Sequence, residues 1–159
     1  MLTRAAWLTL TLVGAATRAV WAQASGQIVN SQTRFVIGVP GGTTNEGAQL
    51  IMWHRDGTPN QNWTQVPTGG GWFKLVNAGS GLCIGVLGGS TADGPAIVQW
   101  HDDGSPNQQW GWRLRRRHRA LLVNRGSGKV IGVQGGSTAQ GAPLIQWHED
   151  GSPNQLWFR

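Results

Sequence analysis

Cysteine is nearly absent from this chain, since Cys83 is the only one in 159 residues, and no internal disulfide can form. Tyrosine is missing altogether. Beyond the first 24 residues no stretch repeats its apolar residues at helical spacing, which argues against a helical fold. The structure must therefore be held together by packing, and the large aromatic residue available for that is tryptophan, which occurs ten times. Cys83 itself lies between Leu82 and Ile84, a setting typical of a buried small hydrophobe.

Residues 1–24 have the pattern of a secretory signal peptide. Arg4 precedes an apolar run that is too short to span a bilayer, and Ala22-Gln23-Ala24 matches a small-x-small cleavage site. We therefore expect a secreted, extracellular protein without a membrane anchor, whose single domain covers residues 25–159. The net charge falls from +6 to +4 on cleavage, because Arg4 and Arg18 leave with the signal peptide.

An internal repeat of 47 residues dominates the rest of the chain. The segment WHRDGTPNQNW at 53–63 returns as WHDDGSPNQQW at 100–110 and as WHEDGSPNQLW at 147–157. Each repeat also holds an Ile-Gly-Val triplet and several short apolar runs bounded by Gly, Pro, Asn or Asp, which predict short strands in hairpins. We place the repeats at about 25–64, 65–111 and 112–159, and the expected fold class is all-β.

Three copies are too few for a solenoid, which needs end caps, so a closed threefold arrangement with one shared core is the economical solution. The last tryptophan of each copy is expected to point into that core. Burying one indole removes about 150–250 Å² from water, a gross gain of about 4–6 kcal/mol that helps to offset the missing disulfides. These inner tryptophans are Trp63, Trp110 and Trp157.

The Asn-Gln-x-Trp endings at 60–63, 107–110 and 154–157 resemble the Q-x-W repeats of the ricin B-type lectin family. The similarity covers essentially all of residues 25–159, and three in-phase copies make it specific. The resemblance implies a β-trefoil with pseudo-threefold symmetry. It also implies carbohydrate binding, with one shallow sugar pocket in each repeat.

In that family an aromatic ring stacks on the apolar face of the sugar, an Asp from an earlier strand accepts hydrogen bonds from hydroxyls, and an Asn before the Q-x-W Gln adds another bond. A pyranose has a C–H face that suits a flat ring and a polar rim that needs donors and acceptors. The positions that match the ring are Trp53, Trp100 and Trp147, and those that match the Asn are Asn60, Asn107 and Asn154.

The family's Asp is missing, because each repeat has Gly at its position: Gly38, Gly85 and Gly132. A hydrogen bond to a charged group contributes about 1.5–3 kcal/mol, so its loss should weaken a site about tenfold to more than a hundredfold. In one interpretation the glycine opens room beside the tryptophan, and the acceptor comes either from the turn, at Asp56, Asp103 and Asp150, or from the Gly-Gly-Ser/Thr-Thr loop of each repeat. In the other, these residues only make turns and the pockets are lost.

The tryptophan of each candidate site is followed by a histidine: His54, His101 and His148. Threefold-related histidines should lie on separate faces, which argues against a metal site. Nothing pairs a nucleophile with an oriented base, so we expect no catalytic residues, and no cofactor is implied. The histidines are expected at a solvated rim or in contact with sugar.

A basic run, RLRRRHR, spans residues 113–119 and falls in a loop between repeats. It is either an ordinary solvated loop or a site for an anionic polymer, with Trp112 close enough to add stacking. For a secreted protein an acidic polysaccharide is a more suitable anion than single-stranded nucleic acid. The cations of this run are Arg113, Arg115, Arg116, Arg117 and Arg119.

The sequence thus predicts a secreted, monomeric, non-catalytic carbohydrate-binding module that engages polysaccharide or glycan weakly through up to three sites. The competing hypothesis is a non-lectin trefoil scaffold that binds a protein or an anionic polymer through its loops and the run 113–119.

Overall fold

The computed structural model describes residues 25–159, and the signal peptide expected at 1–24 lies outside the described residues. The described part consists of thirteen β-strands and seven short 3-10 helices, without an α-helix. Within this range no helix is long and apolar enough to cross a membrane. The expected all-β class is confirmed.

Four strands recur in each repeat. The first repeat contains β2 (Val29–Asn30), β3 (Val36–Gly38), β4 (Ile51–Trp53) and β5 (Trp63–Gly69), preceded by β1 (Ser25–Gly26). The second contains β6 (Trp72–Asn77), β7 (Cys83–Val86), β8 (Ile97–Trp100) and β9 (Trp110–Leu114). The third contains β10 (Ala120–Asn124), β11 (Val130–Val133), β12 (Leu144–Trp147) and β13 (Trp157–Phe158).

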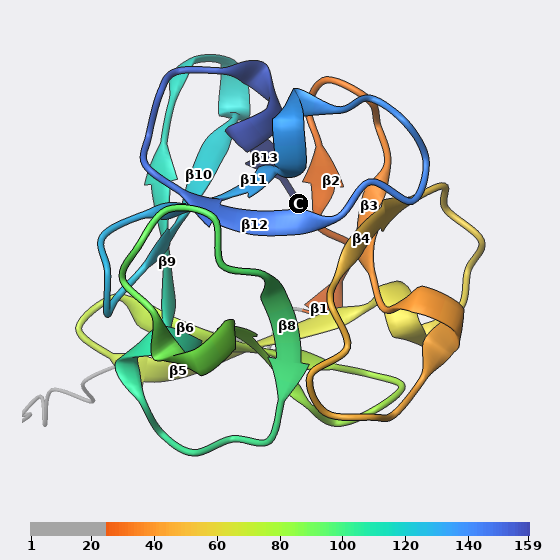
Figure 1. The fold of residues 1–159 in the computed structure, drawn as a ribbon, viewed down its shortest axis with the longest axis vertical. Helices are drawn as coiled ribbons and strands as arrows, with labels where there is room; N and C mark the ends of the chain where they lie inside the picture. Colours follow the sequence, from red (N-terminus) through yellow and green to blue (C-terminus); the bar gives the residue numbers. More distant parts are fainter. Residues whose placement is uncertain (1–24) are drawn as a thin grey trace, which may run out of the picture.

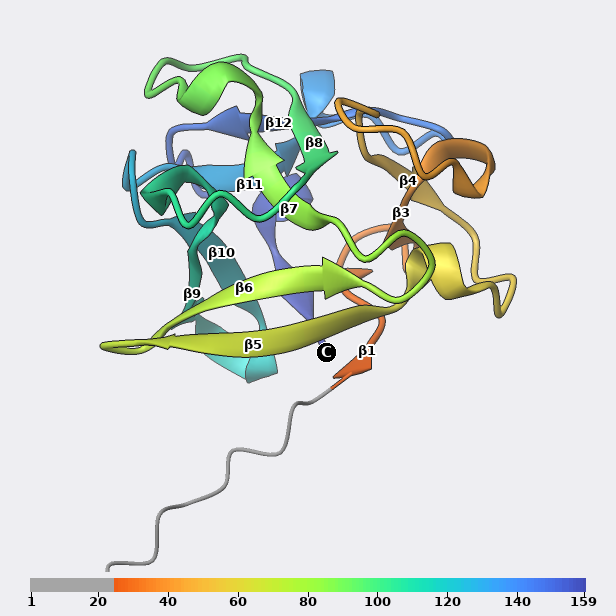
Figure 2. The ribbon, with the colours of Figure 1, turned by 90° about the horizontal axis from the view of Figure 1, so that it is seen from below.

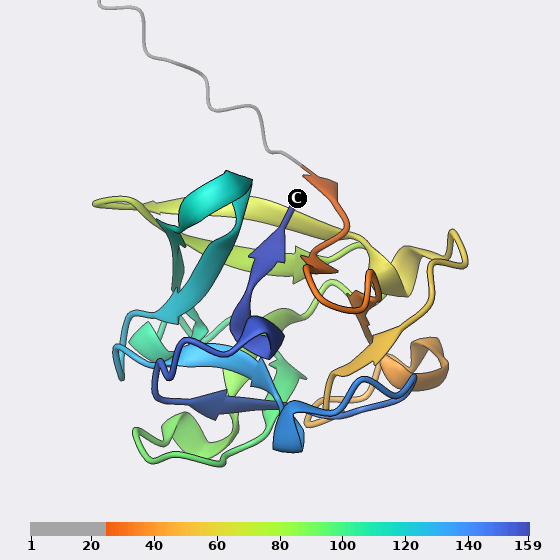
Figure 3. The ribbon, with the colours of Figure 1, turned by 90° about the horizontal axis from the view of Figure 1, so that it is seen from above.

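The first and the last of the four strands in each repeat form a closed barrel of antiparallel pairs. Its order is β5-β6-β9-β10-β13-β2, and β1, which runs just before β2, pairs with β5 and completes the ring. Because the barrel is closed, few strand edges are left unpaired. In Figures 2 and 3 the C-terminus lies beside β1, where the ring closes.

The second and third strands of each repeat form a hairpin that caps one end of the barrel: β3–β4, β7–β8 and β11–β12. Figure 1 shows these hairpins as three lobes around a common centre, which is the pseudo-threefold arrangement of a β-trefoil. Fully buried Leu50, Ile97 and Leu144 join the lobes, because Leu50 N–H donates to Ile97 O at 2.8 Å and Leu144 N–H donates to Leu50 O at 2.9 Å.

The inner tryptophans occupy the core, as predicted. Trp63, Trp110 and Trp157 have no exposed surface, and each indole N–H donates to a backbone carbonyl oxygen of its own repeat. The acceptors are Ile37 O, Ile84 O and Ile131 O, at 3.0, 2.9 and 3.0 Å. Each side chain therefore contributes apolar area without leaving its single polar group unsatisfied. Cys83 is buried, also as expected.

Candidate functional site

Three equivalent pockets open on the cap side of the molecule, one in each repeat. Their volumes are about 410 Å³ in the first repeat, 410 Å³ in the second and 500 Å³ in the third. Each pocket is bounded by a cap hairpin, by the glycine-rich turn that follows the Ile-Gly-Val triplet, and by the loop between the tryptophan that ends the hairpin and the Asn-Gln pair. We call these three tryptophans, Trp53, Trp100 and Trp147, the outer tryptophans. The pockets hold the candidate residues Trp53, Trp100 and Trp147, Asn60, Asn107 and Asn154, and Asp56, Asp103 and Asp150.

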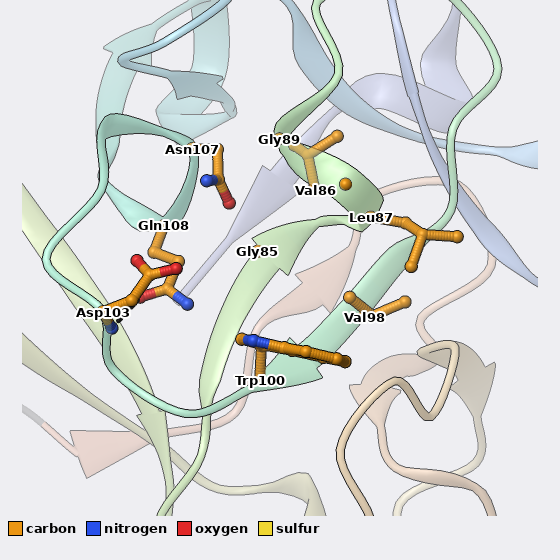
Figure 4. Close-up of a pocket in the computed structure, with 10 residues that line it drawn as sticks. Gly85, Val86, Leu87, Gly89, Val98, Trp100, Asp103, Asn107 and Gln108 are labelled. Carbon is orange, nitrogen blue, oxygen red and sulfur yellow. Dashed lines mark hydrogen bonds between the residues drawn. The ribbon is translucent and has the colours of Figure 1, made fainter.

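The pocket of the second repeat shows how the parts are arranged. Figure 4 shows the indole of Trp100, at the end of β8, along one side of the pocket, with Asp103 and Asn107 facing it from the loop. Val98 and Leu87 add apolar surface beside the ring, and Leu87 is 48% exposed. The pocket thus combines a flat aromatic wall with a polar rim, the two features that a pyranose needs.

The outer tryptophans Trp53, Trp100 and Trp147 are half-buried, and the rings of Trp53 and Trp100 lie against the loop of a neighbouring repeat. A Cβ added to Gly47 would lie 3.4 Å from Cζ3 of Trp100, and one added to Gly141 would lie 3.6 Å from Cζ3 of Trp53. Both glycines have positive φ, of 79° and 85°, which suits glycine in these tight turns. The indole walls of the first and second pockets are therefore each positioned by two repeats.

The Gln of each Q-x-W unit anchors the rim of its pocket. In the second repeat the buried Gln108 accepts a hydrogen bond from Asp103 N–H at 3.1 Å and donates one to His101 O at 2.6 Å. Gln61 and Gln155 make the same two bonds in their repeats. The Gln identifies the family in the sequence, and its constant spacing of five residues from the Asp in all three copies is the signal that points to this role.

An Asn, a hydroxyl and an Asp form a connected chain on each rim. Asn107 Nδ2 donates to Ser105 Oγ at 2.6 Å, and Ser105 N–H donates to Asp103 Oδ1 at 2.8 Å. Hydrogen bonding by the Ser or Thr two residues later holds the pKa of each rim carboxyl below its usual value, chiefly through the side-chain bond. The carboxylates of Asp56, Asp103 and Asp150 are therefore ionised at neutral pH.

One oxygen of each carboxylate stays available. The turn occupies Oδ1 of Asp56, Asp103 and Asp150, while within residues 25–159 no group donates a hydrogen bond to Oδ2 of any of them. A free carboxylate oxygen beside an indole can accept hydrogen bonds from sugar hydroxyls. This arrangement favours the interpretation in which the turn supplies the acceptor that the family takes from an earlier strand.

The glycines that stand at the position of the family's Asp lie close to the Asn and Gln side chains of the rim. A Cβ at Gly85 would lie 3.1 Å from Cγ of Gln108 and 3.2 Å from Oδ1 of Asn107. A Cβ at Gly132 would lie 3.1 Å from Oδ1 of Asn154 and 3.2 Å from Cγ of Gln155. At Gly38 both contacts would be 3.4 Å. Each glycine lines its pocket, and its lack of a Cβ leaves room for the Asn and Gln side chains of the rim.

The histidines do not line the pockets. Each imidazole lies beside its tryptophan, with ring centroids 5.3–5.7 Å apart, and uses Nδ1 to contact the loop of another repeat. The partners differ, because His54 meets Gln140 Oε1 at 3.0 Å, His101 meets Glu46 Oε1 at 2.9 Å and His148 meets Asp93 Oδ2 at 2.9 Å. These exposed residues tie neighbouring repeats together, a contact that the sequence did not reveal.

The basic run forms the turn between β9 and β10, where 3-10 helix η5 covers Arg116–His118. Arg113 and Arg115 both contact Glu149, with Arg113 Nη2 2.6 Å from Oε2. In the described part of the chain, Arg116, Arg117 and Arg119 have no acidic partner. The run therefore divides into two paired cations at its base and three free ones at its tip.

Comparison with known proteins assigns the chain to a family. The model of the ricin-type beta-trefoil lectin domain-like family matches residues 18–100, 59–147 and 106–159. The protein belongs to this family, and its fold is that of carbohydrate-binding lectins. No curated protein sequence matches the chain.

Solved structures share the whole fold. A designed threefold-symmetric protein, ThreeFoil, is 34% identical with a TM-score of 0.82, over 84% of this chain and 96% of that one. An exo-beta-1,3-galactanase from Clostridium thermocellum is 32% identical with a TM-score of 0.81, over 83% of this chain and 29% of the galactanase. The ricin B-like lectin of Macrolepiota procera, solved with lactose, is 24% identical with a TM-score of 0.74, over 86% and 94%. The protein described here spans less than a third of the galactanase, so only the trefoil part is comparable.

Proposed function

We propose that the protein is a secreted, non-catalytic module that binds neutral glycan or polysaccharide weakly at each of its three repeated pockets. The observation that carries the proposal is the threefold recurrence of one arrangement: a half-buried indole facing an ionised carboxylate with a free oxygen and an Asn on the same rim. A trefoil core requires the inner tryptophans but does not require an open wall of indole in every repeat.

Each pocket should bind one sugar residue with low affinity. The pockets are open at the surface, and the Asn side chains are already engaged by Thr58, Ser105 and Ser152. A millimolar site has only about 4 kcal/mol of binding free energy, which stacking and two or three hydrogen bonds can supply. Engaging one polymer through two or three such sites can raise the apparent affinity by about 10²–10⁴.

Two similarities support sugar as the ligand. The family is a lectin-like one, and the Macrolepiota procera lectin with the same fold was solved in complex with lactose. The galactanase that contains a comparable trefoil suggests that such a module can also occur beside a catalytic domain, and we propose that the present chain contributes binding and leaves catalysis to others. The signal-like pattern at residues 1–24 supports secretion.

Alanine substitution of all three outer tryptophans tests the proposal. The Trp53→Ala, Trp100→Ala, Trp147→Ala triple variant should stay folded and lose retention on the insoluble or soluble polysaccharides that the wild type binds in a broad plant and microbial panel. The matched control is Trp72→Ala, which removes a half-buried indole outside the three pockets and should leave retention on neutral polysaccharides intact. Unchanged retention in the triple variant would instead support the scaffold hypothesis.

A further inference from the structure

A fourth cavity lies on the barrel side, away from the three repeated pockets, and none of its lining residues lines any of them. It has a volume of about 370 Å³ and lies where the tip of the β5–β6 hairpin meets β9, strands that Figure 2 shows on the opposite side of the molecule from β7 and β8. We name it the Trp72–Trp112 cleft after its two indoles. Its lining residues are Gly70, Gly71, Trp72, Gly111, Trp112, Arg113 and Val123.

The cleft occurs only once in the threefold fold. One repeat length after Trp72 the sequence has Arg119, one repeat length before Trp112 it has Gln65, and one before Gly111 it has Thr64. Trp112 also packs against the core, but the symmetry of the trefoil does not require an aromatic cleft here.

Both indoles are held in fixed positions. The six-membered ring of Trp72 lies directly against Gly111, since a Cβ at Gly111 would be 3.0 Å from Cζ3 and 3.1 Å from Cε3. Trp112 Nε1 donates to Gln65 Oε1 at 3.1 Å, and its ring packs 6.1 Å from that of Phe73. A rigid aromatic wall loses little conformational entropy when a ligand stacks on it.

Positive charge borders the cleft. Arg113 lines it, and the guanidinium carbon of Arg125 lies 5.9 Å from the centre of the Trp72 ring. The strand of Arg113 continues into the β9–β10 turn, whose tip holds the three arginines without an acidic partner in the described chain: Arg116, Arg117 and Arg119.

The backbone of the β9–β10 turn is strained at residues within the basic run. Arg117 and His118 have φ of 59° and 60°, in the left-handed region, while the corresponding turn one repeat earlier has Gly70 and Gly71 there. A non-glycine residue in this region costs about 1–2 kcal/mol, and such strain is concentrated at functional sites. Glycines would satisfy the hairpin at lower cost, so hairpin formation alone does not explain the basic side chains.

We propose that the Trp72–Trp112 cleft is a fourth, independent binding site that takes an acidic polysaccharide, with a uronate ring against the indoles and its carboxylates toward Arg125 and the arginines of the β9–β10 turn that have no acidic partner. The cavity accommodates about one sugar ring, and guanidinium groups pair well with planar carboxylates. Single-stranded nucleic acid is the competing anion, and the signal-like pattern at residues 1–24 favours an extracellular polysaccharide over it.

Titration calorimetry with oligogalacturonate tests the proposal on the full chain, and the methyl-esterified oligomer provides a neutral probe with the same backbone. Trp72→Ala should weaken oligogalacturonate binding about tenfold. The Arg116→Gln, Arg117→Gln, Arg119→Gln triple variant should weaken it by a similar factor and reduce its salt dependence. The methyl ester should bind the wild type at least tenfold more weakly.

A variant of the repeated pockets separates this site from the proposed function. The Trp53→Ala, Trp100→Ala, Trp147→Ala protein should keep its affinity for oligogalacturonate even though it loses neutral polysaccharide. Gly111→Ala, which displaces the Trp72 ring without removing it, is a second variant if Trp72→Ala unfolds. Wild-type affinity in both cleft variants, equal binding of the methyl ester, loss of binding in the outer-tryptophan variant, or tighter binding of single-stranded DNA than of oligogalacturonate would each overturn the proposal.

Discussion

The side chain of Gln108 holds the backbone N–H of Asp103 at 3.1 Å and thereby connects the buried core to the rim of a pocket. Gln108 is 1% exposed, whereas Asp103 lies at the surface with one free carboxylate oxygen. The other two repeats make the same bond at 3.1 Å. The Q-x-W signature is thus both a mark of the fold and the means by which that fold positions a polar group beside an indole.

Removal of this anchor should destabilise the protein and disturb its pocket. Gln108→Ala leaves Asp103 N–H and His101 O without their partner, at about 1–3 kcal/mol for each group, so we expect a loss of about 2–6 kcal/mol in the free energy of unfolding. Urea denaturation measures this loss. Gln32→Ala, at an exposed glutamine, is the matched control and should change stability by less than about 0.5 kcal/mol. Equal effects of the two substitutions would contradict the anchoring role.

The two sets of tryptophans should respond differently to truncation. Trp110→Ala empties a fully buried site and should cost about 3–5 kcal/mol, while Trp100→Ala at a half-buried pocket wall should cost about 1 kcal/mol. Sugar binding should show the opposite order, because Trp100→Ala should abolish binding at the pocket of the second repeat. Chemical denaturation and a binding assay on the same samples measure both effects, and equal stability losses would argue against separate structural and binding roles.

Restoring the family's Asp should harm this protein. A side chain at Gly85 meets Asn107 and Gln108 within 3.2 Å, so Gly85→Ala should lower stability by about 1–3 kcal/mol and Gly85→Asp by more. Gly26→Ala is the control, because its Cβ would meet only Arg159 Nε, at 3.9 Å. Thermal unfolding compares the variants. If Gly85→Asp raised both stability and sugar affinity, the glycine would not be part of the rim as described.

Acid should weaken the contact between the second and third repeats. Bonds from Lys129 and His148 lower the pKa of Asp93 from 3.8 to about 2. Because the folded pKa lies below the unfolded one, this contribution is fully present above about pH 4 and is lost as the pH falls toward 2. Urea denaturation between pH 5 and pH 2 should show a shallower decline for Asp93→Asn than for the wild type. Parallel declines would exclude Asp93 as a source of acid sensitivity.

The fold could be predicted from the sequence because the repeat is so regular. The spacing of Trp63, Trp110 and Trp157 and the Gly-, Pro- and Asn-bounded runs determine short hairpins around a shared core, and the structure confirms both. The outer tryptophans lie in open pockets together with the Asn residues that match the family and with the Asp residues of the turn. Their binding of sugar stays a prediction.

Contacts between repeats could not be predicted in the same way. His148 meets Asp93, 55 positions away, and Arg113 meets Glu149, 36 positions away, through loops whose relative positions arise only when the trefoil closes. The cleft between Trp72 and Trp112 likewise depends on the pairing of β6 with β9, which no local pattern encodes. The role of Gly85 was missed because the clash it avoids involves side chains more than twenty residues away.

A titration followed by NMR of the indole N–H resonances tests the central claim most directly, since every tryptophan supplies its own signal. As a neutral oligosaccharide that the protein binds is added, the resonances of the outer tryptophans should shift together, and those of the inner tryptophans, which donate to backbone carbonyls in the core, should stay in place. Shifts confined to Trp53, Trp100 and Trp147 would establish three equivalent pockets. A titration in which none of these three indole resonances shifts would contradict the account.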